Sequence, residues 1–212
     1  MNIRVTSELP GIPVEAIEVE VESNPDRCPS IDPSSMARKI VEGYVKVESL
    51  TDNNRIREYR RTLWSFKVDP TKTRPSPEAL ARRIARGKPF PHVSCAVDMV
   101  NLASLEYLVC IGLYDEDKLP APEITLRTSR EGEEFQPIGG NVKVLPKGVP
   151  VASSGSVIIH LYPSRDSSTT AVDEHSRRMV AVAYGYRGDD REYLRVSLRR
   201  FRELLDLCGC VK

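Results

Sequence analysis

The stretch from residue 89 to residue 105 decides how the chain folds: Pro-Phe-Pro-His-Val-Ser-Cys-Ala-Val-Asp-Met-Val-Asn-Leu-Ala-Ser-Leu. Prolines fix the entry, the serine is a suitable N-cap, and a helix is expected to run to about residue 108. Asp98 and Asn101 lie three positions apart, so on this helix they share a face with Leu105. A carboxylate and an amide beside an apolar stripe are costly unless they are hydrogen-bonded. They therefore either tie down neighbouring backbone or line a pocket.

The residues that follow this helix favour the pocket interpretation. Gly112 comes as the chain leaves the helix, and Gly139-Gly140 allows backbone to approach a bound group closely. Between these glycines lie the polar residues Tyr114, Asp115, Arg127 and Glu133. A capped helix with a buried polar network explains the same pattern, and spacing alone does not separate the two interpretations.

Hydrophobic periodicity predicts an α+β protein. Strands are expected within residues 1–22, where 17–22 alternates clearly, and at residues 123–128, 135–138, 142–145, 149–153, 156–162 and 179–186. Residues 110–114 are expected to lead out of the preceding helix through Gly112. The expected helices are residues 34–47, 54–67, 76–87, 94–108 and 190–207. We expect one mixed sheet with helices packed against it. Residues 1–54 are expected to form an N-terminal appendage packed on a domain of residues 55–212.

Composition indicates an ordinary soluble globular protein: 212 residues, of which 40% are hydrophobic and 29% charged. No apolar run approaches the length of a membrane helix, and no signal peptide is recognisable. We therefore expect a cytoplasmic location and no membrane partner.

The cysteines and histidines argue against two kinds of site. Five cysteines lack the paired spacing of a zinc site, so no metal is expected. Cys208 and Cys210 could bind metal or oxidise, but we expect them to be frayed thiols. No local motif places any of the three histidines beside a nucleophile, which argues against a catalytic triad. His160 lies within a predicted strand and is expected to be a satisfied core residue. No cofactor is expected.

Charge is distributed unevenly along the chain although its formal net charge is only +1. Residues 1–54 carry ten acids and five bases, whereas residues 55–91 carry eleven bases and three acids. The basic block is either a phosphate-facing surface or a solvated helix face. Its candidate RNA contacts are Arg74, Arg82, Arg83, Arg86 and Lys88.

Several motifs, taken in order, resemble the B3/4 domain of the phenylalanyl-tRNA synthetase beta chain, and more closely the stand-alone proteins built from that domain alone. The resemblance covers roughly residues 55–170. It is carried by Arg74-Pro75-Ser76-Pro77-Glu78-Ala79 with Arg82-Arg83, Val97-Asp98-Met99-Val100-Asn101, Gly112-Leu113-Tyr114-Asp115, Leu126-Arg127 with Gly132-Glu133, Gly139-Gly140, and Arg165-Asp166-Ser167.

This resemblance implies a B3/4-like fold and editing, the hydrolysis of the ester that links a wrong amino acid to tRNA. It implies that Asn101 orients water or ribose, that Glu133 reads the ammonium group or assists proton transfer, and that Gly139-Gly140 supplies oxyanion-binding amides. It implies substrate binding by Asp98, Gly112, Tyr114, Asp115, Arg127, Arg165, Asp166, Ser167 and Thr169. Arg127 is also a candidate carboxylate partner of Glu133 or Asp98, and the loop from Arg165 to Thr169 is also a candidate Asx turn that starts a helix.

One position departs from the synthetase domain, which has a histidine where this chain has Gly112. Two functions of different classes are therefore carried forward. The first is a free-standing aminoacyl-tRNA deacylase, and the second is a non-catalytic module that binds RNA or an amino-acid-like ligand. An enzyme acting on a free small molecule is a third, weaker hypothesis.

Overall fold

The computed structural model describes residues 2–44 and 47–211, and its elements confirm the α+β class. The helices are α1 (Pro33–Tyr44), α2 (Asn54–Ser65), α3 (Ser76–Ala85), α4 (Cys95–Tyr107) and α5 (Arg191–Leu207), with short 3-10 turns η1 (Val47–Asp52), η2 (Glu116–Lys118) and η3 (Ser168–Thr170). The strands are β1 (Arg4–Ser7), β2 (Val14–Glu20), β3 (Cys110–Asp115), β4 (Glu123–Thr128), β5 (Glu133–Phe135), β6 (Lys143–Leu145), β7 (Pro150–Ser154), β8 (Val157–Leu161), β9 (Arg165–Asp166) and β10 (Arg178–Tyr184).

The strands of the described residues form three sheets, where one was expected. A five-stranded sheet has the order β1-β4-β7-β8-β9, and its β1–β4 pair is parallel while the other pairs are antiparallel. An antiparallel sheet has the order β2-β10-β3, and β5 pairs with β6 as a separate ribbon. The N-terminal strands β1 and β2 are thus edge strands of the two larger sheets. The helix expected to reach residue 47 ends at residue 44, and residues 45–46 lie outside the described residues.

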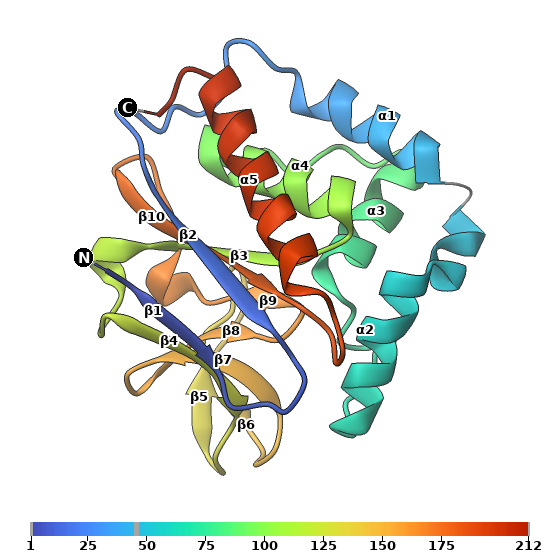
Figure 1. Cartoon of the computed structure of the whole chain (residues 1–212), viewed down its shortest axis with the longest axis vertical. Helices are drawn as coiled ribbons and strands as arrows, with labels where there is room; N and C mark the ends of the chain where they lie inside the picture. The colour runs from blue at the N-terminus through green and yellow to red at the C-terminus, as the bar shows by residue number, and fades with distance from the viewer. Residues whose placement is uncertain (1, 45–46, 212) are drawn as a thin grey trace.

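The three-stranded sheet lies between helices and the five-stranded sheet (Figure 1). Alternation along β10 explains this placement, because successive side chains point to opposite faces. Met179, Ala181 and Ala183 join a buried cluster with α4 and α5, whereas Val180 and Val182 join a cluster with the five-stranded sheet. No helix within the described ranges is long and apolar enough to span a membrane.

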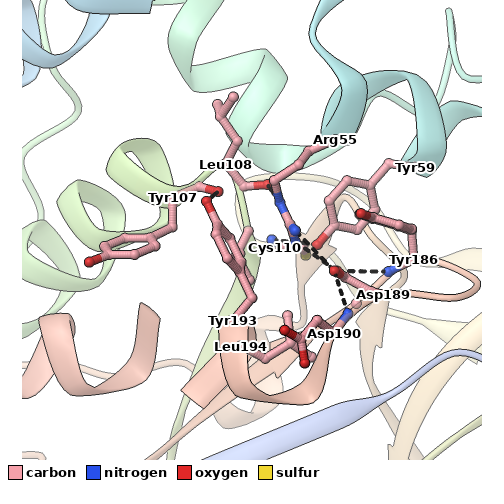
Figure 2. Close-up of polar contacts among 12 residues, drawn as sticks. Arg55, Tyr59, Tyr107, Leu108, Cys110, Tyr186, Asp189, Asp190, Tyr193 and Leu194 are labelled. Carbon is pink, nitrogen blue, oxygen red and sulfur yellow. Dashed lines mark hydrogen bonds and ion pairs between the residues drawn. The ribbon is translucent and has the colours of Figure 1, made fainter. Parts of the chain in front are cut away.

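Arg55 fixes the start of β3 from the side of α2 (Figure 2). Its guanidinium donates two hydrogen bonds to Asp189, at 2.9 and 2.7 Å, and one to the carbonyl of Leu108 at 3.4 Å. The same group lies over the rings of Tyr186 and Tyr193, 5.0 and 4.1 Å from their centroids. The end of α4, the turn after β10 and the start of α5 are therefore held by one side chain.

Next to Arg55, buried tyrosine hydroxyls form a hydrogen-bond network between the two larger sheets. Tyr59 donates to the carbonyl of Tyr184 at 2.6 Å and accepts from the backbone amide of Cys110 at 3.1 Å. The hydroxyl groups of Tyr114 and Tyr184 lie 2.9 Å apart. Each of these hydroxyls has a partner, as buried polar groups require.

Gly112 leaves room for this network. A Cβ atom at position 112 would lie 2.1 Å from the hydroxyl oxygen of Tyr114 and 2.9 Å from Oδ1 of Asp166. Both distances are far below van der Waals contact, so a side chain at this position must displace a buried ring. The structure therefore gives a steric reason why a histidine is not accommodated here while Tyr114 keeps its place.

We predict that Gly112→Ala lowers the free energy of unfolding by about 1–3 kcal/mol or more, the usual range for overpacking a core. Gly43→Ala is the matched control, because Gly43 lies in α1 with nothing within 4 Å of an added Cβ. That substitution should raise stability by roughly 0.5–1 kcal/mol, since alanine has the better helix propensity. Urea denaturation measures both variants, and equal effects would contradict the steric account.

Candidate functional site

A cavity of ≈ 210 Å³ opens where the edge of β3 meets the helices and the five-stranded sheet. It contains residues from α3, α4, β3, β8 and β9, so distant parts of the chain converge on it. Its lining comprises Ser76, Leu80, Asn101, Ser104, Ile111, Ile138, His160, Ser164, Arg165 and Asp166. We call this hollow the Asn101 pocket.

One wall of the Asn101 pocket is a buried chain of polar contacts that ends in a carboxylate. Nδ1 of His160 lies 2.7 Å from Oδ1 of Asp166, and its Nε2 lies 3.6 Å from the sulfur of Cys110. Ser76 donates its hydroxyl to the same sulfur at 3.4 Å. The imidazole also stacks on Tyr184, with ring centroids 4.6 Å apart. His160 is thus held on every side and fixes the orientation of Asp166.

The surroundings of His160 keep its ring protonated at neutral pH. Burial of the ring lowers its pKa, but the Cys110 sulfur and the Asp166 carboxylate together outweigh burial and raise the pKa from 6.5 to about 10. An imidazolium is a poor proton acceptor. The two ring nitrogens face Asp166 and Cys110, so His160 anchors the carboxylate that lines the pocket.

Asn101 and Arg165 contribute polar groups that have no protein partner among the described residues. The side chain of Asn101 makes no hydrogen bond to any described residue, although it is partly buried against the pocket. Arg165 is exposed at the rim and has no acidic partner among the residues that the structure describes. Both groups are available to a ligand, which distinguishes them from the other polar residues predicted for the site.

Asp98 lies on the same helix as Asn101 but has a different role. It is fully buried, contacts Nδ1 of His92 at 2.8 Å and accepts from the backbone amide of Val93 at 3.2 Å. Burial raises the pKa of the Asp98 carboxyl more than these contacts lower it. Of the two alternatives drawn from the sequence, Asp98 ties down backbone and Asn101 lines the pocket.

Tyr114 and Asp115 are also occupied within the fold. Burial raises the pKa of the Tyr114 hydroxyl, which faces Tyr184 and not open space. Asp115 caps η2 by accepting from the amide of Asp117 at 2.9 Å and accepts from the hydroxyl of Ser176 at 2.6 Å. Neither residue lines the Asn101 pocket.

The structure does not bring Glu133 together with Asn101. Glu133 lines a separate hollow of ≈ 320 Å³ together with Ser167 and Thr169. Arg127 donates to it twice, at 2.9 and 2.8 Å, so the predicted Arg127–Glu133 pair is present. These hydrogen bonds lower the pKa of Glu133 more than burial raises it. Both carboxylate oxygens of Glu133 therefore accept from Arg127, and the expected role of Glu133 in proton transfer stays a prediction.

The two glycines expected to bind an oxyanion form an exposed turn. The amide of Gly140 donates to the carbonyl of Pro137 at 3.3 Å, and Gly139 has a φ angle of 68°. The Gly140 amide is therefore not directed at a ligand. Ile138 precedes the turn and reaches the Asn101 pocket, so the glycines border the cavity without entering it. Ser167 caps η3 and donates to the carbonyl of Gln136 at 2.9 Å.

Part of the basic block is neutralised within the protein. Glu78 is fully buried and is surrounded by Arg60 at 2.6 Å, Arg82 at 2.7 Å and Arg74 at 3.7 Å. A buried carboxylate requires such partners, so these arginines have a structural role. The remaining candidates on α3 and after it, Arg83, Arg86 and Lys88, are exposed. Arg83 also donates to the carbonyl of Pro89 at 2.7 Å.

His160 and Cys110 were missed as members of the site. Their sequence separation is fifty residues, and each lies in an apolar strand pattern that is typical of core positions. One signal was present in the sequence. Asp166 follows His160 by six residues, and two antiparallel strands joined by a short turn place such residues opposite each other.

Comparison with known proteins agrees with this architecture. Residues 58–202 match the B3/4 domain, which is more than half of the chain. The chain belongs to the B3/4 domain family. A stretch of 116 residues is 29% identical to the phenylalanine–tRNA ligase beta subunit of Carboxydothermus hydrogenoformans, covering 55% of this chain. The match spans only 14% of that protein, so the chain is related to one domain of a tRNA ligase subunit.

From the contact between His160 and Asp166 we predict how the free energy of unfolding depends on pH. The folded state retains a proton on His160 up to about pH 10, whereas an unfolded histidine loses it near pH 6.5. This contribution to stability is present in full below pH 6.5 and is lost as the pH rises through about 10. The free energy of unfolding should therefore fall less steeply over this range in His160→Gln than in the wild type.

Denaturation curves at several pH values test this, with His175→Gln as the control because that side chain is exposed. Parallel pH profiles for the wild type and His160→Gln would contradict the proposed protonation of His160.

Proposed function

We propose that this B3/4 domain protein hydrolyses the ester bond of aminoacyl-tRNA in the Asn101 pocket. The observation that carries the proposal is the convergence of Asn101, Arg165 and Asp166 on one cavity with groups that a ligand can reach. The relationship to a tRNA ligase subunit supports tRNA as the carrier of the substrate.

The cavity suits the reacting end of such a substrate. A water molecule occupies about 30 Å³ of liquid, so ≈ 210 Å³ has room for an aminoacyl group or several waters. Leu80 and Ile111 supply apolar contacts for a side chain, and Arg165 at the rim supplies a cation for a backbone phosphate. The size and lining therefore fit a small acyl group attached to a nucleotide that stays outside.

The chemistry needs only modest catalysis, because an aminoacyl ester is already activated. Oδ1 of Asp166 contacts His160, and its Oδ2 accepts a proton from a water in the pocket as that water attacks the ester carbon. The same carboxyl returns the proton to the ribose oxygen as the ester C–O bond breaks. Asn101 donates its amide to the carbonyl oxygen as negative charge develops there. We assign proton transfer to Asp166 and not to Glu133, because Glu133 lines a separate hollow and both of its oxygens accept from Arg127.

Cys110 is not assigned as a nucleophile although it lies beside His160. Its sulfur belongs to a residue with no exposed surface, and it does not line the Asn101 pocket. An ester carbon cannot reach it without rearrangement of the core. The Cys110–His160–Asp166 series therefore positions a carboxylate and does not form a covalent intermediate.

The hydrolysis test uses a panel of tRNAs, each charged with a labelled amino acid, and measures release of the label. We predict that Asn101→Ala and Asp166→Asn each reduce the rate by about 100-fold or more, the usual effect of removing such a group. Binding of uncharged tRNA should be unchanged in both variants. Glu133→Gln and Cys110→Ser should retain most of the activity.

Each outcome distinguishes between the two functions. Loss of tRNA binding in parallel with hydrolysis would argue against a chemical role for Asn101 and Asp166. Binding of an aminoacyl nucleoside without hydrolysis in the whole panel would favour the non-catalytic binding module. A large loss of activity in Cys110→Ser would replace water attack with a covalent mechanism.

A separate prediction concerns the surface that would hold the RNA. Arg86 and Lys88 are exposed, and neither forms an ion pair within the described residues. If they contact phosphate, replacing both with alanine should weaken tRNA binding and reduce the slope of log affinity against log salt by about one per lost contact. Arg199 and Arg202 on α5 provide the control, because both pair with acids on the same helix. An unchanged slope would place the RNA elsewhere.

A further inference from the structure

Four of the five cysteines lie close together in the interior, where segments from the early and the late part of the chain meet. Cys28 lies in the loop between β2 and α1, Cys95 is the first residue of α4, and Cys208 and Cys210 follow α5. All four are buried, with at most 7% of any residue exposed. The expectation that the last two are frayed thiols is therefore wrong.

Three of these sulfur atoms have the spacing of a small metal site, and the fourth, on Cys210, adjoins the group through Cys95. The ligand atoms of Cys28, Cys95 and Cys208 all lie within 4.8 Å of one another. The sulfur of Cys210 lies 3.0 Å from that of Cys95. Four sulfurs around one Zn²⁺, at about 2.3 Å each, are separated from one another by about 3.8 Å. The Cys28–Cys208 and Cys95–Cys210 sulfurs are closer to each other than this, so the tetrahedral spacing requires the disulfide to open and both pairs to separate.

Backbone contacts hold the segments that carry these cysteines. The amide of Cys95 donates to the carbonyl of Pro25 at 2.7 Å, and the amide of Glu22 donates to the carbonyl of Cys210 at 2.9 Å. Val21 and Val211 form an isolated β-bridge beside them. Main-chain hydrogen bonds therefore hold these segments together whether or not their sulfurs are bonded to each other.

We propose that the reduced protein binds one Zn²⁺ through the thiolates of Cys28, Cys95, Cys208 and Cys210. An all-sulfur tetrahedral set is typical of structural zinc, whereas Mg²⁺ and Ca²⁺ require oxygen ligands. Cys95 is the first residue of α4, so the site would include the start of that helix. The ion would join the loop after β2, α4 and the tail after α5.

The structure contains a Cys28–Cys208 disulfide, and this bond and the zinc site exclude each other. Reduction of the disulfide by a phosphine adds two electrons and two protons, giving four thiols with Cys95 and Cys210. Binding of Zn²⁺ then releases the four thiol protons as four Zn–S bonds form. No other redox partner is required.

The test uses the untagged full-length chain, purified with a phosphine reductant and dialysed against Zn²⁺ and then against metal-free buffer. Elemental analysis should find about one zinc per chain. Cys95→Ser and Cys210→Ser should each lose most of this zinc, although both variants keep the cysteines of the disulfide. Cys110→Ser, which removes a buried cysteine outside the cluster, should retain it.

Two further measurements make the result independent of folding defects. Co²⁺ added to the reduced wild-type protein should give the visible and thiolate charge-transfer bands of a tetrahedral sulfur site. A chelator should lower the thermal midpoint of the zinc-loaded protein, and added zinc should restore it. Absence of zinc from the reduced wild type, or equal loss in Cys110→Ser, would overturn the proposal. So would mass spectrometry that finds two disulfides in protein purified with the reductant.

Discussion

The absence of a side chain at position 112 is the constraint on which the candidate site depends. The space that a Cβ atom would occupy is taken by the hydroxyl of Tyr114, with a carboxylate oxygen of Asp166 close behind it. His160 completes the group by stacking on Tyr184 and contacting Asp166. A larger residue at position 112 would displace the ring or the carboxylate. The position of Asp166 in the Asn101 pocket is therefore set by the backbone of β3 as much as by its own strand.

The same strand is held at its beginning by Arg55. Its ion pair with Asp189 and its bond to the carbonyl of Leu108 fix the turn between α4 and β3 (Figure 2). The hydroxyl of Tyr59 then binds the amide of Cys110. Breaking a buried pair of this kind leaves an uncompensated charge, which costs about 3–5 kcal/mol. The strand that contributes Ile111 to the pocket is therefore held by buried polar contacts at its first residue.

Features that depend on a local sequence pattern were predictable, whereas features that depend on contacts between distant segments were not. The helix carrying Asp98 and Asn101 was predictable from capping and periodicity. For Arg127 the sequence offered Glu133 or Asp98 as the carboxylate partner, and the structure pairs it with Glu133. The division of the strands into two main sheets was not predictable, because strand pairing between distant segments leaves no local signature. For the same reason the cysteine spacing concealed a cluster that forms only after folding.

The central claim is that Asn101, Arg165 and Asp166 form the site for the acyl end of an aminoacyl-tRNA. The most direct measurement is a crystal structure of the protein with an aminoacyl-adenosine whose ester is replaced by a stable amide. The account predicts that the acyl group lies in the Asn101 pocket, with its carbonyl near Asn101 and Asp166 close enough to hold a water against it. An analogue bound beside Glu133, Ser167 and Thr169, with the Asn101 pocket left to solvent, would contradict it.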